Sequence, residues 1–398
     1  MKRSIGINQK PLKAHLVASQ HAGKLLLVGL VGVAWHNWRL WQRNKRLLVE
    51  KKRAAPLPAL EGWPELPLVS VLVAAWNEIE HIDQHIQSFL ALRYPNKELI
   101  LCAGGADGTY QQAKRYVGPQ VRVFEQQAGE GKQRALHRCL PHTRGALIFL
   151  TDADCVLDNE SFERTLYPVA AGIEHVCTGS SRPDSTQLSN PFVVAQVASQ
   201  LYSDLHRSTY AAGLLGRNCA VNRSLLEQSK GLAAPAPTGT DYVLAKMLVR
   251  AGARIRQVPE SRIVTDYPTT TQAYVRQQRR WIRNVGLHGV RFGAYSEVRA
   301  SLQSSLIGLM MLLLPWGWLI GLKAALLLWV LLLWHGVLSR VRYLYLCYNC
   351  LVPDTAAMFR ITIQIKQLML QPVMLFLDFF AWTQPLRDYV LPKRQKEW

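Results

Sequence analysis

The sequence predicts an α/β domain with a mostly parallel sheet, flanked by transmembrane and interfacial α-helices. Strand-like and helix-like runs alternate through the middle of the chain, which is the pattern of consecutive βα units. Long uncharged apolar stretches lie near both ends, and about 20 such residues cross a bilayer as a helix. The 398 residues include 47 Lys and Arg against 27 Asp and Glu, and the formal charge of +20 favours phosphate-bearing partners such as nucleotides or an anionic membrane face.

Residues 1–53 are predicted to form an N-terminal membrane anchor helix with a basic flank. The apolar centre, Leu25–Trp35, reaches the length of a span when the residues on both sides are added. Seven cations lie within the 15 residues from Arg39 to Arg53, and such flanks stay on the cytoplasmic side of a membrane. The alternative is an anchor helix that lies in the membrane interface.

The proline-rich residues 54–67 are predicted to be a linker, and residues 68–299 the α/β domain. Apolar patterns place the elements of this domain. Strands are expected at 68–74, 98–103, 121–125 and 146–151, and helices at 78–92, 110–116 and 132–140. Ligands of such sheets bind beyond the carboxyl ends of the strands, so the polar residues at those ends are the candidates for a site.

Residues 300–398 are predicted to form a C-terminal membrane region. Two uncharged stretches between residues 300 and 339 predict a helical hairpin with its bend near Gly317 and Gly321. The alternative is a pair of buried core helices, although few soluble helices are apolar on all sides. Residues 358–386 mix apolar and charged side chains, and they predict an interfacial or a third transmembrane helix.

Polar side chains suited to a ligand follow three of the predicted strands. They are Asn77 and Glu78 after the first strand, Asp107 after the second, and Asp152 with Asp154 after the fourth. Two carboxylates at i and i+2 beyond an apolar strand favour a Mg²⁺ or Mn²⁺ ion that bridges a diphosphate. The alternative is a capped turn, in which Asp154 or Asp158 begins the next helix.

Two common phosphate-binding motifs are excluded. The turn after the first strand, Ala74–Glu78, lacks the glycines of a dinucleotide fingerprint. The pair Gly131-Lys132 lacks both the earlier Gly and the following Ser or Thr of a P-loop, because those positions are Gln126 and Gln133.

Two further polar motifs lie closer to the C-terminal membrane region. Asp241 precedes an apolar helix and suits either a helix N-cap or a general base. Gln277, Arg280 and Trp281 come shortly before the predicted hairpin. They suit either a solvated basic helix face or a juxtamembrane phosphate-binding stripe with an aromatic residue at the interface.

Taken in order, these pieces resemble the family-2 glycosyltransferases, specifically the membrane-bound branch that includes polysaccharide and glycolipid synthases. The resemblance covers residues 69–281 and rests on the order of the motifs rather than on any one of them. The motifs are the strand and turn Val69–Glu78, the turn Gly104–Thr109, Gly131-Lys132, the D-x-D motif Asp152–Asp154, the loop Gly216–Ser224, Thr240-Asp241 and the Q-x-x-R-W motif Gln277–Trp281.

The resemblance implies the GT-A fold and a metal-dependent, inverting transfer of a hexose from a nucleotide sugar, in which Asp241 is the base that takes the acceptor's proton. It also implies which residues bind the ligands. Mg²⁺ or Mn²⁺ would be held by Asp154 with Asp152. The donor would be bound by Asn77, Glu78, Asp107, Lys132 and Asp152. The acceptor and the diphosphate would be flanked by Gln277, Arg280 and Trp281.

The sequence departs from the family pattern at two places that matter for the chemistry. Thr240 stands where a Glu usually precedes the base. Cys102-Ala103 stands where an acidic residue usually reaches the nucleobase, which leaves the identity of the base open.

The leading hypothesis is an integral protein of the cell or inner membrane, with its catalytic domain facing the cytoplasm and a lipid or polysaccharide acceptor. A processive polysaccharide synthase is the first alternative, although few transmembrane helices are predicted. A non-catalytic partner subunit is the second. A nucleic-acid partner is not expected, because charge alone favours it and no recognisable module is present.

Overall fold

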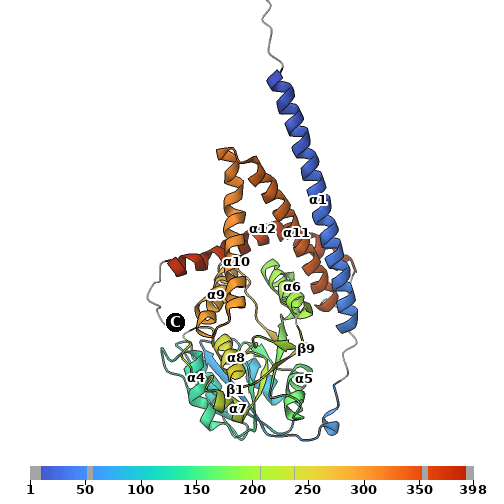
Figure 1. Ribbon diagram of the computed structural model, residues 1–398. Helices are drawn as coiled ribbons and strands as arrows, with labels where there is room; N and C mark the ends of the chain where they lie inside the picture. The colour runs from blue at the N-terminus through green and yellow to red at the C-terminus, as the bar shows by residue number, and fades with distance from the viewer. Residues whose placement is uncertain (1–9, 52–56, 207, 237, 352–356, 391–398) are drawn as a thin grey trace, which may run out of the picture.

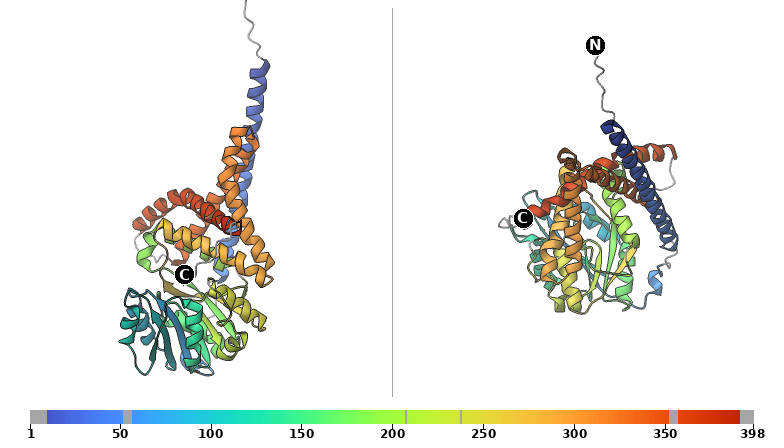
Figure 2. Two further views of the ribbon diagram at one scale, coloured as in Figure 1. Left: turned by 90° about the vertical axis from the view of Figure 1, so that its left-hand side faces the viewer. Right: turned by 45° about the horizontal axis from the view of Figure 1, so that its top comes forward.

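The computed structural model of the chain describes residues 10–51, 57–206, 208–236, 238–351 and 357–390. An α/β domain lies at one end, and three long helices project from it (Figure 1). They are α1 (Lys10–Lys51), α10 (Tyr295–Leu313) and α11 (Lys323–Leu351). The helix α12 (Ala357–Val390) crosses the base of this projection, between the domain and the hairpin, as the side view in Figure 2 also shows.

Four parallel strands form the first half of the sheet. They are β1 (Val69–Trp76), β2 (Lys97–Gly104), β3 (Val121–Glu125) and β4 (Leu147–Leu150), in the spatial order β3-β2-β1-β4. All four were placed by the sequence within two residues. Their carboxyl ends therefore lie along one edge of the sheet, as predicted.

The second half of the sheet is mixed. Strand β8 (Cys219–Asn222) runs antiparallel to both β4 and β6 (Val176–Arg182), and β6 pairs in parallel with β9 (Ile255–Thr265). The short strands β5 (Cys155–Val156) and β7 (Tyr210–Ala211) pair antiparallel with β9. Within the described residues these strands complete a nine-stranded sheet.

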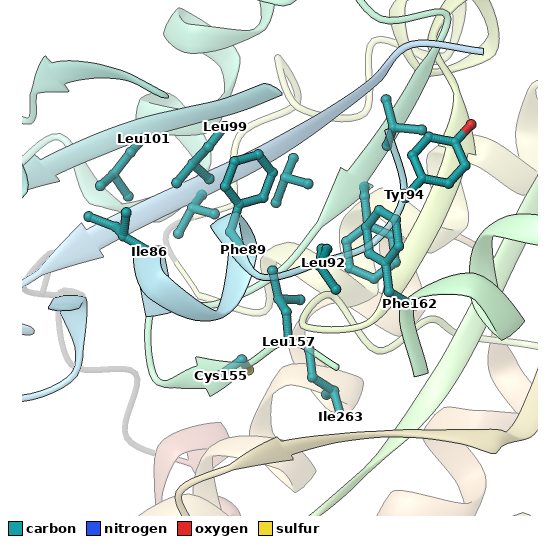
Figure 3. Close-up of a cluster of buried hydrophobic side chains, with 14 of the residues drawn as sticks. Ile86, Phe89, Leu92, Tyr94, Leu99, Leu101, Cys155, Leu157, Phe162 and Ile263 are labelled. Atoms are coloured by element: carbon teal, nitrogen blue, oxygen red, sulfur yellow. The ribbon is translucent and has the colours of Figure 1, made fainter. Parts of the chain in front are cut away.

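One face of the sheet is covered by α2 (Ile82–Leu90), α3 (Thr109–Lys114) and α5 (Asn159–Ala170). Leu99 and Leu101 of β2 lie near Phe89 and Ile86 there, and Phe162 lies beside Tyr94 in the same cluster (Figure 3). The predicted helix at 78–92 begins only at Ile82, because residues 78–81 form a turn in which the N–H groups of His81 and Ile82 donate to the carbonyl of Glu78.

The opposite face is covered by α4 (Gly131–Cys139), α7 (Arg223–Ser229) and α8 (Thr240–Arg250). Leu72 of β1 points into this second cluster, whereas its neighbours Val71 and Val73 point into the first. Strands that are buried on both faces read as continuous apolar runs, which explains why the sequence located them.

A layer of helices separates the sheet domain from the projecting helices. It consists of α6 (Pro191–His206), α9 (Thr271–Arg291) and α12, and α12 packs against both α9 and α10. Close packing is evident at Gly308 of α10, where an added Cβ would lie 2.7 Å from the carbonyl oxygen of Phe379 in α12.

The hairpin bends where the sequence predicted. A 3₁₀ segment, η4 (Leu314–Ile320), follows α10, and Gly321 has the left-handed φ of 80° that ends it. Residues 295–320 and 323–350 are long and apolar enough to cross a membrane, and only 17% and 11% of their apolar windows are buried. They are therefore not the buried core helices that were the alternative. The N-terminal anchor was predicted over residues 1–53, of which residues 1–9, 52 and 53 lie outside the described residues. The side chains of residues 10–22 are not described either.

Candidate active site

The turns after β1 and β2 are locked together by two of the predicted donor-site residues. The Asn77 Oδ1 accepts from the N–H of Ala106 at 2.9 Å, and Asp107 accepts from the N–H groups of Ile79 and Thr109, each at 3.0 Å. Gly105 is required between them, because its φ is +119° and an added Cβ would lie 2.2 Å from Asn77 Oδ1. These contacts give Asn77 and Asp107 a role in shaping the rim of the site.

Glu78 lies beside the aspartate pair. Its pKa is raised to about 7, first by partial burial and then by the negative charge of Asp154, with smaller contributions from Asp152 and Asp107. The carboxylates of Glu78, Asp152 and Asp154 therefore share one electrostatic environment, as their positions at neighbouring strand ends predicted.

Asp152 is held by two cations. Its Oδ1 lies 2.6 Å from the Lys132 Nζ, and its Oδ2 lies 3.7 Å from the Arg217 Nε. Burial alone would raise the pKa of Asp152, but Lys132 and Arg217, with a further contribution from Arg280, hold it below its usual value. Asp152 is therefore ionised at neutral pH.

Asp154 is not a helix cap. The N-cap of α5 is Asp158, whose carboxylate accepts from the N–H of Ser161 at 2.8 Å. Asp154 instead accepts from the Thr265 hydroxyl at 3.2 Å, at the end of β9. Among the described residues, Lys132 and Arg217 therefore form ion pairs with Asp152 and not with Asp154.

Arg217 is a site residue that the sequence analysis did not single out. Besides its direct contact with Asp152, its Nη1 donates to the Thr265 hydroxyl at 2.8 Å, and that hydroxyl donates to Asp154, so Arg217 reaches the second aspartate through Thr265. A single Arg in a loop forms no periodic pattern that a sequence analysis can detect. The only indication in the sequence was that Arg217 lies in the loop Gly216–Ser224, one of the motifs that resemble the family.

Asp241 faces the same cluster from α8. The N-cap of α8 is Gly239, so the N-cap alternative for Asp241 is wrong. The Asp241 Oδ2 accepts from the N–H of Gly216 at 3.2 Å, and its Oδ1 lies 3.6 Å from the Lys132 Nζ. Lys132 thus stands between Asp152 and Asp241.

The three residues of the Q-x-x-R-W motif lie within little more than one turn of α9. Arg280 is exposed and is close enough to Asp152 to lower its pKa, and the Trp281 side chain is 43% exposed. The Gln277 Oε1 is buried and has no hydrogen-bond partner among the described residues. Of the three, Arg280 is the one that the electrostatics tie to the aspartates.

No group of three or more His, Cys, Asp and Glu side chains in the described part of the chain is arranged to hold a metal ion by itself. The D-x-D carboxylates would supply only part of a coordination shell. That is the arrangement expected where Mg²⁺ or a similar ion takes its other ligands from substrate phosphates and water.

The chain matches known glycosyltransferases in sequence and fold. A family model described as "Glycosyltransferase like family 2" matches residues 65–284. EpsE of Bacillus subtilis (strain 168) is 31% identical over 112 residues, which cover 27% of this chain and 39% of EpsE. A poly-beta-1,6-N-acetyl-D-glucosamine synthase of Staphylococcus epidermidis is 29% identical over 98 residues, 23% of each protein. The chain therefore aligns with well under half the length of these relatives.

A solved structure extends the match over nearly the whole chain. The mannosyltransferase PcManGT from Pyrobaculum calidifontis, in complex with GDP-Man and Mn²⁺, superposes with a TM-score of 0.53. The match has 17% sequence identity and covers 94% of this chain and 99% of that one. The predicted α/β fold of the GT-A type is confirmed by this likeness.

Proposed function

The chain belongs to the glycosyltransferase-like family 2, and on that premise we propose that it is a membrane-bound, inverting glycosyltransferase. It would move a hexose from a nucleotide-sugar donor to a lipid or glycan acceptor. The observation that carries the proposal is the position of Lys132, whose Nζ lies 2.6 Å from Asp152 and 3.6 Å from Asp241. A donor-side carboxylate and a candidate base thus face one another across a single ammonium group.

The proposed transfer needs a base that accepts the proton of the acceptor hydroxyl, and cations that stabilise the negative charge on the leaving diphosphate. Asp241 takes the proton of the acceptor hydroxyl, whose oxygen forms a bond to the anomeric carbon. The bond between that carbon and the diphosphate oxygen breaks at the same time, and the nucleoside diphosphate leaves with the electron pair. Lys132, Arg217 and Arg280 surround Asp152 and would stabilise the charge that develops on the diphosphate.

A Mg²⁺ or Mn²⁺ ion fits the aspartate side of the site. Asp154, with Asp152, would hold it. Burial and then the neighbouring carboxylates raise the pKa of Glu78, and this crowding of acidic groups supports a cation there. When bound, such an ion neutralises charge on the leaving diphosphate. The superposed PcManGT complex contains Mn²⁺ together with its nucleotide sugar.

The remaining predicted residues are assigned by their position. The rim on the donor side is formed by Asn77, Glu78 and Asp107. The acceptor side, next to Arg280, is formed by Gln277 and Trp281. The side chains of Cys102 and Ala103 are fully buried, which agrees with main-chain or neighbouring groups holding the nucleobase.

We further propose that α10 and α11 cross the cell membrane, that α12 lies in its interface, and that the catalytic domain faces the cytoplasm. The cations from Arg39 to Lys51 and those from Arg276 to Arg299 flank the predicted membrane segments and support this orientation. A processive polysaccharide synthase is a second candidate, which the similarity to poly-beta-1,6-N-acetyl-D-glucosamine synthases favours.

The test is to incubate membranes that contain the full chain with a panel of labelled nucleotide sugars, and to separate organic-soluble from polymeric products. Label in the organic phase supports a lipid acceptor, and label in polymer supports the synthase. Asp241→Asn should lower transfer by about 10²–10⁴-fold with donor affinity unchanged. Asp158→Asn is the matched control, because Asn caps the helix as well as Asp does. Transfer by Asp241→Asn within about threefold of the unmodified protein would contradict the assignment.

A further inference from the structure

We propose that a buried triad of Tyr274, Asp378 and Arg340 fixes the helix α9 and thereby positions Gln277, Arg280 and Trp281 at the acceptor side of the site. The triad joins the catalytic domain to the C-terminal membrane region. Its members are positioning residues, and the inference rests on the proposed function.

The three side chains form one continuous contact across three helices. The Tyr274 hydroxyl of α9 donates to Asp378 Oδ1 of α12 at 2.6 Å, and the second oxygen of Asp378 pairs with the Arg340 guanidinium of α11. Arg340 Nη1 also lies 3.4 Å from the carbonyl oxygen of Ala195 and 3.3 Å from the Ser199 hydroxyl, both in α6. The polar contacts therefore connect α9 with α12, α11 and α6.

All three members of the triad are deeply buried. Tyr274 and Asp378 are 1% exposed, and Arg340 is 5% exposed. A buried charge is tolerated only when it is paired and hydrogen-bonded, so each helix must sit where its side chain meets the others. Any other rotation of α9 would leave the Tyr274 hydroxyl and one oxygen of Asp378 without partners in an apolar surrounding.

The apolar contacts around Tyr274 do not define that rotation as sharply. Tyr274 packs with Ala195 and Met374, and its ring lies 5.8 Å from the ring of Phe192. Apolar contacts of this kind are non-directional and tolerate repacking. The hydrogen bond to Asp378 is directional, so it selects one rotation of α9 from those that the apolar cluster allows.

The far end of α9 is tied to the segment that carries the candidate base. The Asn284 Oδ1 accepts from the Thr238 hydroxyl at 2.8 Å, and His288 Nε2 lies 2.8 Å from the Thr238 carbonyl oxygen. Thr238 precedes Gly239, the N-cap of α8, and Asp241 follows in the first turn of that helix. The Q-x-x-R-W residues lie between these two attachments, so the triad and Thr238 together set their position relative to Asp241.

The experiment compares Tyr274→Phe with Tyr94→Phe in the full chain. Tyr94 is a matched control, because it is also fully buried and its hydroxyl also donates one hydrogen bond, to the Pro67 carbonyl oxygen at 2.7 Å, but within the α/β core. Tyr274→Phe should lower kcat for transfer or raise the acceptor KM by about tenfold or more, since small misplacements of positioning groups are costly. Donor affinity should stay within about twofold, and Tyr94→Phe should change neither constant.

A second measurement does not depend on the reaction. Backbone amide exchange of residues 274–284 should accelerate in Tyr274→Phe, while exchange of β1 and β2 stays unchanged. Normal exchange together with normal transfer in Tyr274→Phe would overturn the positioning role. If the unmodified protein transferred no sugar from any donor, the proposed function would fail, whereas the exchange experiment would still decide whether the triad fixes α9.

The ionic half of the triad has its own test. Asp378→Asn retains an acceptor for Tyr274 but leaves the buried Arg340 charge unpaired, so the melting temperature should fall. Adding Arg340→Met removes that charge, and the double variant should recover both melting temperature and transfer relative to Asp378→Asn. Failure of the double variant to recover either quantity would contradict the pairing.

Discussion

Lys132 lies between Asp152 on the proposed donor side of the site and Asp241, the proposed base. Its ammonium group touches Asp152 and approaches Asp241. Burial alone would lower the pKa of Lys132, but these two carboxylates hold it above its usual value. A fixed cation at this point offsets the repulsion between the two carboxylates. In the proposed reaction, the same cation would be available to the diphosphate of the donor.

The two aspartates of the D-x-D motif are expected to differ in their effects. Asp154→Asn should abolish turnover, because it removes the hard anionic ligand that is not already paired with Lys132. Asp152→Asn should weaken donor affinity, because it removes the second hard anionic ligand of the proposed metal ion. Transfer and donor binding measured with added Mn²⁺ or Mg²⁺ check both. Full activity of both variants in excess chelator would refute the metal assignment.

Glu78 is expected to make stability depend on pH. The pKa of its carboxyl is about 7 in the folded chain and about 4.5 when unfolded, so the folded state binds more protons in that window. Stability therefore falls as the pH rises from about 4.5 to 7. Glu78→Gln removes this loss, so its melting temperature relative to the unmodified protein should be higher at pH 8 than at pH 5. The measurement is thermal unfolding in chelator, and equal differences at both pH values would count against the raised pKa.

At the scale of elements, the approach of β8 to α8 depends on one glycine before β8. An added Cβ at Gly216 would lie 2.1 Å from Asp241 Oδ1, so any side chain there displaces the carboxylate from Lys132. Gly216→Ala should lower transfer by about 10²-fold or more, in line with misplacement of a reacting group. Gly213→Ala is the control in the same loop, because nothing lies within 4 Å of its added Cβ. Equal transfer rates in the two variants would contradict this account.

The elements of the α/β domain could be predicted because their patterns are local. The strand β3 was predicted with its observed bounds, and the bend at Gly321 follows from glycine alone. Other features depend on partners that are distant in sequence. Arg217 meets Asp152 only through the antiparallel insertion of β8, and Tyr274 meets Asp378 across 104 residues. The sequence left two roles for Asp241, helix N-cap or general base. It could not decide between them because the N-cap of α8 is Gly239, whose left-handed conformation is visible only in the structure.

At the scale of the whole molecule, the chain combines a cluster of charges with an apolar projection. The exposed side chains of the hairpin include Leu313, Trp316, Leu319 and Ile320, and a patch of this kind marks contact with a membrane or a partner. The layer formed by α6, α9 and α12 lies between this hairpin and the sheet (Figure 2). An acceptor that enters from a membrane would therefore meet α9 before it reaches Asp241.

The orientation of the molecule gives the last prediction. If α10 and α11 cross the membrane, Lys323 at the start of α11 emerges on the side opposite to the catalytic domain. Single cysteines at Gln120, an exposed residue directly before β3, and at Lys323 should therefore react with an impermeant maleimide from opposite sides. The native cysteines interfere little, because Cys102, Cys139, Cys155, Cys177, Cys219 and Cys347 are buried and Cys350 is half-buried. Gln120→Cys should label only in inverted vesicles and Lys323→Cys only in intact cells, because the basic flanks are expected to keep the domain in the cytoplasm. Labelling of both positions from the same side would mean that the hairpin does not span the membrane, and labelling of Gln120→Cys in intact cells would reverse the orientation.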